Sequence, residues 1–443
     1  MALGAIDFGR YFQEIERASP VRVRGRVKAV VGLVVRATLP QAFIGELCLI
    51  YNPRSRIPTK AEVVGFQADD VLLMPIGELT NIGPQSVVDA TGNCLTVKVG
   101  DGLLGRVLNG VGDPIDADVA GALTPTAEYP VYAPPPNALR RRRVTNPISI
   151  GVRAIDGLLT CGEGQRIGLF AAAGVGKSTL LGMIARNTEA DINVIVLVGE
   201  RGREVRDFLE QDLGPEGLKR SVVICATSNE PSLVRLKAAQ VGTAIAEYFR
   251  DQGRRVMLLM DSVTRFARAQ REIGLALGEP PARAGYTPSV FSELPKLLER
   301  SGNSDRGSIT AFYTVLVAGD DMNEPVADEV RSILDGHVIL SRELAARGHY
   351  PAIDVLESIS RVMSGVAGQE HRRAAGRMRE VLATYEKNKD LILIGAYEKG
   401  TNPAVEYALR MLDCVHRFLK QETQEKAAIG ETAEALQKLF ANG

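Results

Sequence analysis

The stretch RIGLFAAAGVGKST, residues 166–179, constrains the fold of this chain more than any other feature. Residues 166–171 read as a short buried strand, AAGVG is a loop of small residues, and apolar residues recur at helical spacing from Lys177 onward. Small residues allow backbone N–H groups to close around phosphate oxygens, and the start of the following helix adds a favourable dipole. The stretch therefore predicts a strand, a phosphate-binding loop and a helix.

Individual residues of this loop have predicted roles. Lys177 is expected to reach the β- and γ-phosphates of a nucleotide, and the Ser178 hydroxyl to ligate Mg²⁺. The generic motif begins with glycine where this chain has Ala171, so the motif alone leaves an ordinary glycine-rich turn open. The predicted nucleotide-binding residues of the loop and helix start are Ala173, Gly174, Val175, Gly176, Lys177, Ser178 and Thr179.

The composition argues against several classes of protein. With 443 residues, of which 45% are apolar, the chain is long enough for two or three domains. Basic and acidic residues both number 53, so no net field favours nucleic acid or an anionic membrane. Scattered cysteines and histidines argue against a zinc site or a histidine-based triad. The amino terminus lacks the apolar run of a signal peptide and no stretch approaches a membrane span, so we expect a cytoplasmic protein.

The first hundred residues favour a small β-barrel. Between Val21 and Val35, apolar residues alternate with arginine and lysine, and only a strand places such residues on opposite faces. Further strands are predicted at 46–51, 61–66, 71–74 and 95–99, separated by the turn signals NPRS, ADD and TGN. Short strands at this spacing suggest a closed barrel. Its aromatic residues do not cluster, which favours a packing or assembly module over a nucleic-acid-binding barrel.

Alternating strands and helices follow the phosphate loop and predict an open, mostly parallel α/β sheet. The predicted strands are 192–198, 221–226, 256–260 and 309–317, and the predicted helices are 203–211 and 232–251. Ligands of such sheets bind beyond the carboxyl ends of the strands. The connectors that lead into this region, 100–118 and 129–147, are rich in Gly and Pro. We interpret the arginine run at 140–143 as a solvated or subunit-facing linker rather than a nucleic-acid patch.

Two apolar strands end in a carboxylate at the predicted ligand edge. Asp261 ends RRVMLLMD, where it can hold the Mg²⁺ shell opposite Ser178; the alternative is a helix cap. Glu200 ends INVIVLVGE, where it can orient and polarise the water that attacks a phosphate. Its alternative is a salt bridge to Arg201 or Arg203.

A helical pattern continues from about residue 369 to the end. Asn402 and Pro403 provide a helix start, as an N-cap followed by proline at the first helical position. In the last segment Ile429, Ala433, Leu436 and Phe440 form one apolar stripe. We therefore predict a small helical domain.

Long stretches of the chain resemble the ATPases of bacterial type III secretion systems, which are relatives of the F-type ATP synthase headpiece subunits. The resemblance runs from about residue 20 to the C-terminus, and it is carried by GERGREVRDFLEQDLGPEGLKRSVV, LLMDSVTRFARAQREIGLALGEPPARAGYTPSVFSELPKLLERSG, SITAFYTVLVAGDDMNEPVADEVRSILDGHVILSR and YPAIDVLESISRVM. PAIDVLESIS fits the signature of this lineage, and alanine in place of the first loop glycine is usual among the secretion ATPases.

The resemblance implies a fold and a domain order. The fold is α/β, a RecA-like P-loop NTPase core with an N-terminal small β-barrel and a C-terminal helical domain. The implied segments are an N-terminal tail at 1–18, an oligomerisation barrel at 19–99, an ATPase domain at 100–365 and a helical domain at 366–443.

The resemblance also implies roles for single residues. Glu200 falls on the catalytic glutamate of the family, with Lys177 on the phosphate-loop lysine. Glu204 falls on a second acidic position near the metal, and Arg201 and Arg265 fall on positions close to the γ-phosphate.

Two further positions concern the adenine and the neighbouring subunit. Tyr350 sits where the catalytic F-type subunit stacks a tyrosine on adenine, and Arg361 sits where the family supplies an arginine finger to the adjacent site. Because this chain has both Glu200 and Arg361, it is expected to form a homohexameric ring with a site at every interface.

The implied function is hydrolysis of ATP with Mg²⁺ to power type III secretion, through chaperone release and unfolding of exported proteins. The implied partners are stalk and regulatory proteins, chaperone–effector complexes and the membrane-embedded export gate at the inner-membrane base, without nucleic acid. GDDMNEPVADEVRSILDGH looks closer to the injectisome branch. The alternatives are a flagellar export ATPase, a rotary ATP synthase subunit, a hexameric RNA translocase of the transcription-terminator type and a structural ring without turnover.

Overall fold

The computed structural model describes Phe12 and residues 24–52, 57–80, 82–317, 319 and 321–441. The chain divides into two compact units, the first ending at Leu95 and the second beginning at Thr96. Apart from Phe12, the predicted tail 1–18 lies outside the described residues, as do residues 21–23 of the first predicted strand. Among the described residues, no helix combines the length and the apolar character that crossing a membrane requires.

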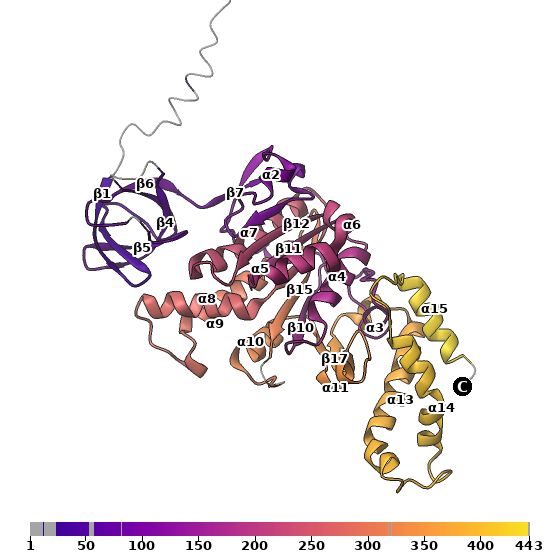
Figure 1. Ribbon diagram of the computed structural model, residues 1–443. Helices are drawn as coiled ribbons and strands as arrows, with labels where there is room; N and C mark the ends of the chain where they lie inside the picture. The colour runs from indigo at the N-terminus through magenta and orange to yellow at the C-terminus, as the bar shows by residue number, and fades with distance from the viewer. Residues whose placement is uncertain are drawn as a thin grey trace, which may run out of the picture. The chain divides into compact units, whose positions relative to one another are not determined.

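The described part of the first unit is a closed antiparallel barrel of six strands (Figure 1), in the order β1, β2, β5, β4, β3, β6, with β1 pairing back to β6. The strands are β1 (Arg24–Val31), β2 (Val34–Thr38), β3 (Glu46–Tyr51), β4 (Thr59–Gln67), β5 (Asp70–Pro75) and β6 (Val87–Cys94). Inward-facing residues such as Val35, Ile50 and Leu73 fill the barrel, as the alternating pattern requires. The prediction of a small closed barrel is therefore confirmed, and the structure gives its strand number and order.

The barrel differs from the sequence-based prediction in two places. The strand predicted from Val21 to Val35 is a hairpin, because Gly32, at φ +58°, turns the chain between β1 and β2 while the two-residue period continues across the turn. The TGN stretch, predicted as a turn, lies inside β6 as a bulge with Gly92 at φ +72°.

The barrel also ends earlier than predicted. Strand β7 (Thr96–Val99), expected at the end of the barrel, pairs with β9 (Ala127–Pro130) and belongs to the second unit. The local pattern of β7 predicts a strand correctly, but it contains no information about which strand becomes its partner.

The second unit is built on a sheet of nine strands within the described residues, in the order β17, β16, β10, β15, β13, β11, β12, β8, with β14 paired to β15. The pairs are parallel except at β17 and β14. The strands are β8 (Val107–Asn109), β10 (Arg166–Ala171), β11 (Ile192–Glu200), β12 (Ser221–Thr227), β13 (Arg255–Asp261), β14 (Gly302–Asn303), β15 (Ser308–Leu316), β16 (Gly336–Leu340) and β17 (Ile353–Ser360). The carboxyl ends of β10, β15, β13 and β11 therefore lie side by side at one edge.

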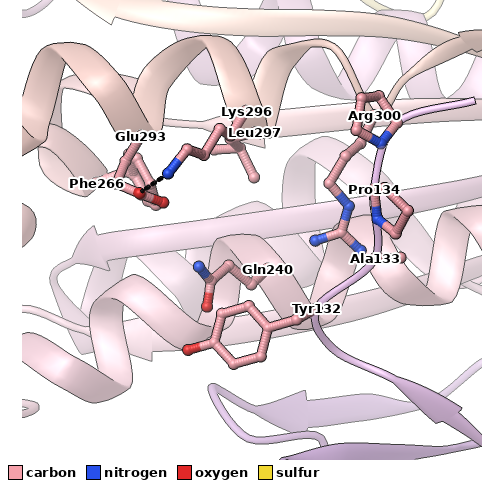
Figure 2. Close-up of a pocket in the computed structure, with 10 residues that line it drawn as sticks. Tyr132, Ala133, Pro134, Gln240, Phe266, Glu293, Lys296, Leu297 and Arg300 are labelled. Atoms are coloured by element: carbon pink, nitrogen blue, oxygen red, sulfur yellow. Dashed lines mark hydrogen bonds and ion pairs between the residues drawn. The ribbon is translucent and has the colours of Figure 1, made fainter. Parts of the chain in front are cut away.

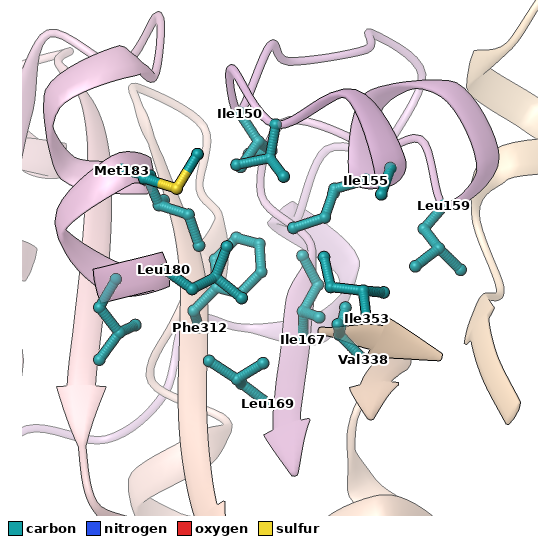
Figure 3. Packing of buried hydrophobic residues seen from close by; sticks show 14 of the residues in the cluster. Ile150, Ile155, Leu159, Ile167, Leu169, Leu180, Met183, Phe312, Val338 and Ile353 are labelled. Atoms are coloured by element: carbon teal, nitrogen blue, oxygen red, sulfur yellow. The ribbon is translucent and has the colours of Figure 1, made fainter. Parts of the chain in front are cut away.

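Helices cover this sheet. Among the described residues from 96 to 366 the α-helices are α2 (Ala117–Ala120), α3 (Arg153–Leu158), α4 (Lys177–Asn187), α5 (Gly202–Asp207), α6 (Gly214–Lys219), α7 (Ser232–Asp251), α8 (Val263–Ala276), α9 (Pro288–Leu298), α10 (Pro325–Ile333), α11 (Arg342–Ala346) and α12 (Met363–Val366), and α3 to α8 and α10 pack directly on the strands of the sheet. The helix predicted at 203–211 is α5 followed by a π-helical turn, Phe208–Leu213. Figure 3 shows Leu180 and Met183 of α4 packed beside Leu169 and Phe312 of the sheet. This packing fixes the helix that follows the phosphate loop.

The C-terminal region is helical, as predicted. It contains α13 (Gln369–Leu393), α14 (Pro403–Leu419) and α15 (Ile429–Leu439), and α13 and α14 lie side by side in Figure 1. The predicted cap at Asn402 is present, since its side chain accepts a hydrogen bond of 3.0 Å from the Ala404 N–H. Leu436 and Phe440 are buried, as the predicted stripe requires.

The connector at 129–147, which precedes β10, is held by two of its arginines. Arg141 donates to the Ser301 carbonyl oxygen at 2.8 Å, and Arg142 donates to the Ser304 carbonyl oxygen at 2.9 Å. Two arginines of the run at 140–143 therefore bond within the chain, whereas the prediction was a solvated or subunit-facing linker.

A cavity of about 300 Å³ lies where this connector passes α7, α8 and α9. Figure 2 shows Tyr132, Gln240 and Arg300 around it, from the connector, from α7 and from the segment after α9. Its lining, all within the described part of the chain, includes none of the predicted site residues.

Candidate nucleotide-binding site

The phosphate loop connects β10 to α4 at the carboxyl edge of the sheet. Gly174 and Gly176 have φ values of +82° and +86°, which glycine adopts without steric cost. Gly176 is the N-cap of α4, so the helix begins at Lys177 and its first N–H groups face the loop. The segment therefore has the backbone arrangement that binds phosphate oxygens at a helix N-terminus.

Strand order brings the predicted lysine and carboxylates together. Lys177 Nζ bonds to both carboxylate oxygens of Asp261 and lies 3.8 Å from Glu200 Oε1. The side chains of Lys177, Glu200 and Asp261 are 12%, 14% and 4% exposed. Arg201 and Arg203, the alternative partners of Glu200, pair with Glu204 and with Asp207 instead.

The Glu200 carboxyl has an unusually high proton affinity. Burial, followed by the negative charge of Asp261, raises the pKa of Glu200 to about 7, although Lys177 opposes this rise. A hydrogen bond from Glu200 lowers the pKa of Glu204, because the Glu204 carboxylate accepts it. A carboxylate with a pKa near neutrality is suited to accept a proton from an attacking water.

Apart from Arg361, the remaining charged residues predicted for this site lie around Glu200. Arg201 Nη1 is 3.2 Å from Glu204 Oε1 at the exposed start of α5. Arg265, on α8, passes Gly199 so closely that a Cβ there would lie 3.0 Å from Arg265 Cδ. Its Nε is buried without a hydrogen-bond partner among the described residues, so it has donor capacity left for an anion.

Tyr350 lies beside the phosphate loop. A Cβ added to Gly176 would lie 3.6 Å from two ring carbons of Tyr350. Tyr350 is 46% exposed, so its ring remains accessible beside the loop. The Tyr350 carbonyl oxygen accepts a 3.0 Å hydrogen bond from the Gln421 N–H. Tyr350 also lines a cavity of about 780 Å³ with residues at the end of α14 and in the loop that follows it. The arrangement offers an exposed aromatic ring next to both the loop and a cavity.

Comparison with known proteins assigns this architecture to a family. Residues 151–360 match the nucleotide-binding domain of the ATP synthase alpha/beta family, residues 27–92 match its beta-barrel domain, and residues 367–438 match the T3SS EscN ATPase C-terminal domain. The chain is 56% identical to the flagellum-specific ATP synthase of Bacillus subtilis (strain 168), with 97% of this chain and 98% of that protein covered. It is 53% identical to the type 3 secretion system ATPase of Xanthomonas euvesicatoria, with 96% of each covered.

This chain belongs to the family of type III secretion and flagellar ATPases. It is similar to the assembled ATPase EscN of enteropathogenic E. coli, with a TM-score of 0.87, 47% sequence identity and coverage of 94% of this chain and 99% of that one. It is also similar to EscN in complex with its central stalk EscO, with a TM-score of 0.86 and 46% identity. The chain is therefore an ATPase with the predicted three-part fold.

In this ATPase, Arg361 lies apart from the other predicted site residues. Its N–H donates to the Asp335 carbonyl oxygen at 3.0 Å, and the Asp335 N–H donates to the Arg166 carbonyl oxygen at 2.9 Å. Arg166 begins β10, whereas the phosphate loop follows Ala171 at the other end of that strand. The exposed Arg361 therefore lies at the edge of the sheet opposite the loop of its own chain.

The donors near the loop fit a hard divalent cation. The predicted ligands Ser178, Glu204 and Asp261 offer only oxygen, which Mg²⁺ prefers. No group of three or more acidic, histidine or cysteine side chains among the described residues could hold a metal ion. This combination suits Mg²⁺ bound through one or two protein oxygens and the phosphates of a nucleotide.

Sequence reasoning missed two contributors to this site. Thr314 bonds to Asp261, and Gln421 bonds to the main chain of Tyr350. Neither lies in a recognisable local motif. The position of Thr314 follows only from the strand order, which inserts β15 between β10 and β13.

Proposed function

We propose that this ATPase hydrolyses ATP with Mg²⁺ at sites shared between identical chains of a homohexameric ring, and that hydrolysis powers type III protein export. One observation carries the proposal: Lys177, Glu200 and Asp261 converge at one edge of the sheet, while Arg361 lies at the opposite edge. A ring of identical chains can bring the edge that carries Arg361 in one copy to the edge that carries Lys177 in the next copy.

Each residue near the loop has a task in this proposal. Lys177 and the N–H groups at the start of α4 bind phosphate oxygens. Glu200 orients the attacking water and accepts its proton, and Arg201 and Arg265 face the γ-phosphate. Bound Mg²⁺ would neutralise phosphate charge, held by Ser178 and Asp261 with Glu204 close by. These residues give each chain all but one of the groups that phosphoryl transfer requires.

A stacking surface for the adenine and an arginine from an adjacent copy complete the proposed site. The exposed ring of Tyr350 stacks on the adenine, with the neighbouring cavity as the space for the base and ribose. Arg361 of an adjacent copy supplies the arginine finger that stabilises negative charge in the transition state. A chain on its own would therefore bind nucleotide but turn it over slowly.

Similarity to EscN supports the assembly and the partners. That protein is described as an assembled ATPase and as a complex with its central stalk EscO, so we propose a ring with a stalk protein for this chain too. Within such a machine the ATPase would release chaperones and unfold exported proteins, at the cytoplasmic face of a membrane-embedded export gate.

The branch of the family is the finer question. The sequence favours the injectisome, and we propose that role. The flagellar export ATPase is the second candidate, because the Bacillus subtilis flagellar relative is 56% identical against 53% for the Xanthomonas secretion relative. Complementation of an injectisome ATPase deletion and of a flagellar ATPase deletion, scored by effector secretion and by motility, distinguishes the two.

The biochemical test is Mg-ATPase activity per milligram over a wide range of protein concentration. Specific activity should rise with concentration, and Arg361→Ala should remain low throughout. Arg373→Ala is the matched control, since it removes an exposed arginine, 66% exposed, from α13. A specific activity that does not change with protein concentration or with Arg361→Ala would contradict shared sites. An ATPase activity that RNA stimulates would favour the RNA translocase alternative.

A further inference from the structure

Thr314 is a fully buried hydroxyl at the centre of the site. It lies on β15, between the strand that leads into the phosphate loop and the strand that ends in Asp261. Met260 pairs with Tyr313 across the ladder, so Thr314 is level with Asp261. The Thr314 hydroxyl donates to Asp261 Oδ1 at 2.7 Å.

We propose that Thr314 is a positioning residue that orients the Asp261 carboxylate toward nucleotide-bound Mg²⁺. This inference rests on the proposed Mg-ATPase function and adds a residue to it. Thr314 acts through Asp261 and is not itself placed against the nucleotide.

The contacts of Asp261 explain why a second donor is needed. Its side chain is only 4% exposed, so water cannot orient it, and its other bonded donor is Lys177. An ammonium group on a four-carbon chain moves readily, and phosphate oxygens compete for it. If Lys177 turns to a phosphate, the hydroxyl of Thr314 is the donor that still holds Asp261.

The strand makes Thr314 a rigid donor. A β-branched side chain on a strand has restricted χ1 freedom, so the hydroxyl has little choice of direction. The end of β15 is fixed as well, because the Leu316 N–H donates to Thr264 Oγ1 at 2.8 Å. Thr264 lies three residues after Asp261, so β15 and the segment around Asp261 are bonded at two points. Once Lys177 has turned to a phosphate, the hydrogen bond from Thr314 to Oδ1 leaves the lone pairs of Oδ2 available for a ligand.

The same strand contains a matched control. Thr310 is also fully buried, and its Oγ1 accepts a 2.9 Å hydrogen bond from the Gly164 N–H, beyond the opposite end of β10 from the phosphate loop. Thr310→Val therefore removes a buried hydroxyl from β15 without touching Asp261. Any effect shared by both valine variants reports the strand and not the site.

The experiment measures nucleotide binding by the full chain, with a fluorescent ATP analogue titrated in Mg²⁺ and in EDTA. Thr314→Val should weaken binding in Mg²⁺ by about tenfold, the size expected for losing a hydrogen bond to a charged group, and should leave binding in EDTA unchanged. Thr314→Ser, which keeps the hydroxyl but loses the β-branch, should retain most of the wild-type Mg²⁺ dependence, and Thr310→Val should retain all of it. The Mg²⁺ concentration that gives half-maximal ATPase activity should be higher for Thr314→Val than for the wild type.

Two outcomes would overturn the inference: a Mg²⁺ dependence of Thr314→Val equal to that of Thr310→Val, or an equal loss of binding in EDTA. If the valine variant does not fold, Thr314→Ala compared with Thr314→Ser gives the same test, because these two differ by one hydroxyl. A wild-type chain whose nucleotide binding and hydrolysis are indifferent to Mg²⁺ would refute the proposed function as well. An unchanged variant beside a Mg²⁺-dependent wild type refutes the role of Thr314 alone.

Discussion

Mixing two inactive variants tests whether Glu200 and Arg361 act from different chains. Within one chain, the Arg361 main chain bonds to Asp335, which bonds to Arg166 at the start of β10, and the loop begins after Ala171 at its end. Arg166 and Ala171 are five residues apart on the strand, which at about 3.3 Å per residue separates the two ends of β10 by roughly 16 Å. This distance is longer than an arginine side chain. Glu200→Gln and Arg361→Ala should therefore each reduce the rate, the second by about 10³-fold or more.

In an equal mixture, an interface is complete when an Arg361→Ala chain supplies Glu200 and a Glu200→Gln chain supplies Arg361. Random assembly makes about one quarter of the interfaces complete, so mixed rings should recover up to about one quarter of the wild-type ATPase activity. The double variant, mixed with either single variant, is the control and should recover nothing. Failure of the two single variants to rescue each other, when mixed oligomers are demonstrated by differential tagging, would refute the shared site.

Perturbing Glu200, Tyr350 and Arg300 tests three further contacts in the second unit. Because Glu200 has a pKa of about 7 and must be deprotonated to accept a proton, kcat/KM should rise about tenfold per pH unit below pH 7 and level off above it. In Glu204→Gln the rising part of the pH–rate profile should move to lower pH, because the hydrogen bond that favours protonated Glu200 is weakened. An unchanged profile would count against Glu200 as the group that accepts the proton. Tyr350→Ala should raise the KM for ATP about tenfold by removing a stacking surface, whereas Tyr350→Phe should leave it nearly unchanged in steady-state assays. Arg300→Met should lower the free energy of unfolding by about 3–5 kcal/mol, because it leaves the Glu247 carboxylate, which is 1% exposed, without its partner. Thermal or chemical unfolding measures the loss, and adding Glu247→Gln should recover part of it.

The sequence predicts the site where a local pattern and a chemical requirement coincide. The loop at 172–176, with its small residues before Lys177, is recognisable because phosphate binding demands that composition. Asp261 and Glu200 are recognisable because each ends an apolar strand at the edge where ligands bind in parallel sheets. Their convergence with Lys177 in the structure follows from these two rules.

The sequence does not predict features that depend on strand order. The two-residue period of β1 and β2 runs through Gly32, so the hairpin cannot be distinguished from one long strand. Thr314 looks like any buried threonine until β15 is known to lie beside β13. The proposed roles of Tyr350 and Arg361 rest on the resemblance alone, because a single exposed side chain on a loop or at a strand end has no periodic signal.

The direction of one strand explains why the proposed site is incomplete within a chain. β16 runs parallel to β10, and β17 runs antiparallel to β16. A parallel β17 would deliver Arg361 to the edge where Lys177 lies, and each chain could then hold every catalytic group. Because β17 is antiparallel, its last residue, Ser360, pairs with Gly336 at the opposite edge, and the next residue is Arg361. We therefore expect assembly itself to control turnover, since the finger reaches a phosphate only across an interface.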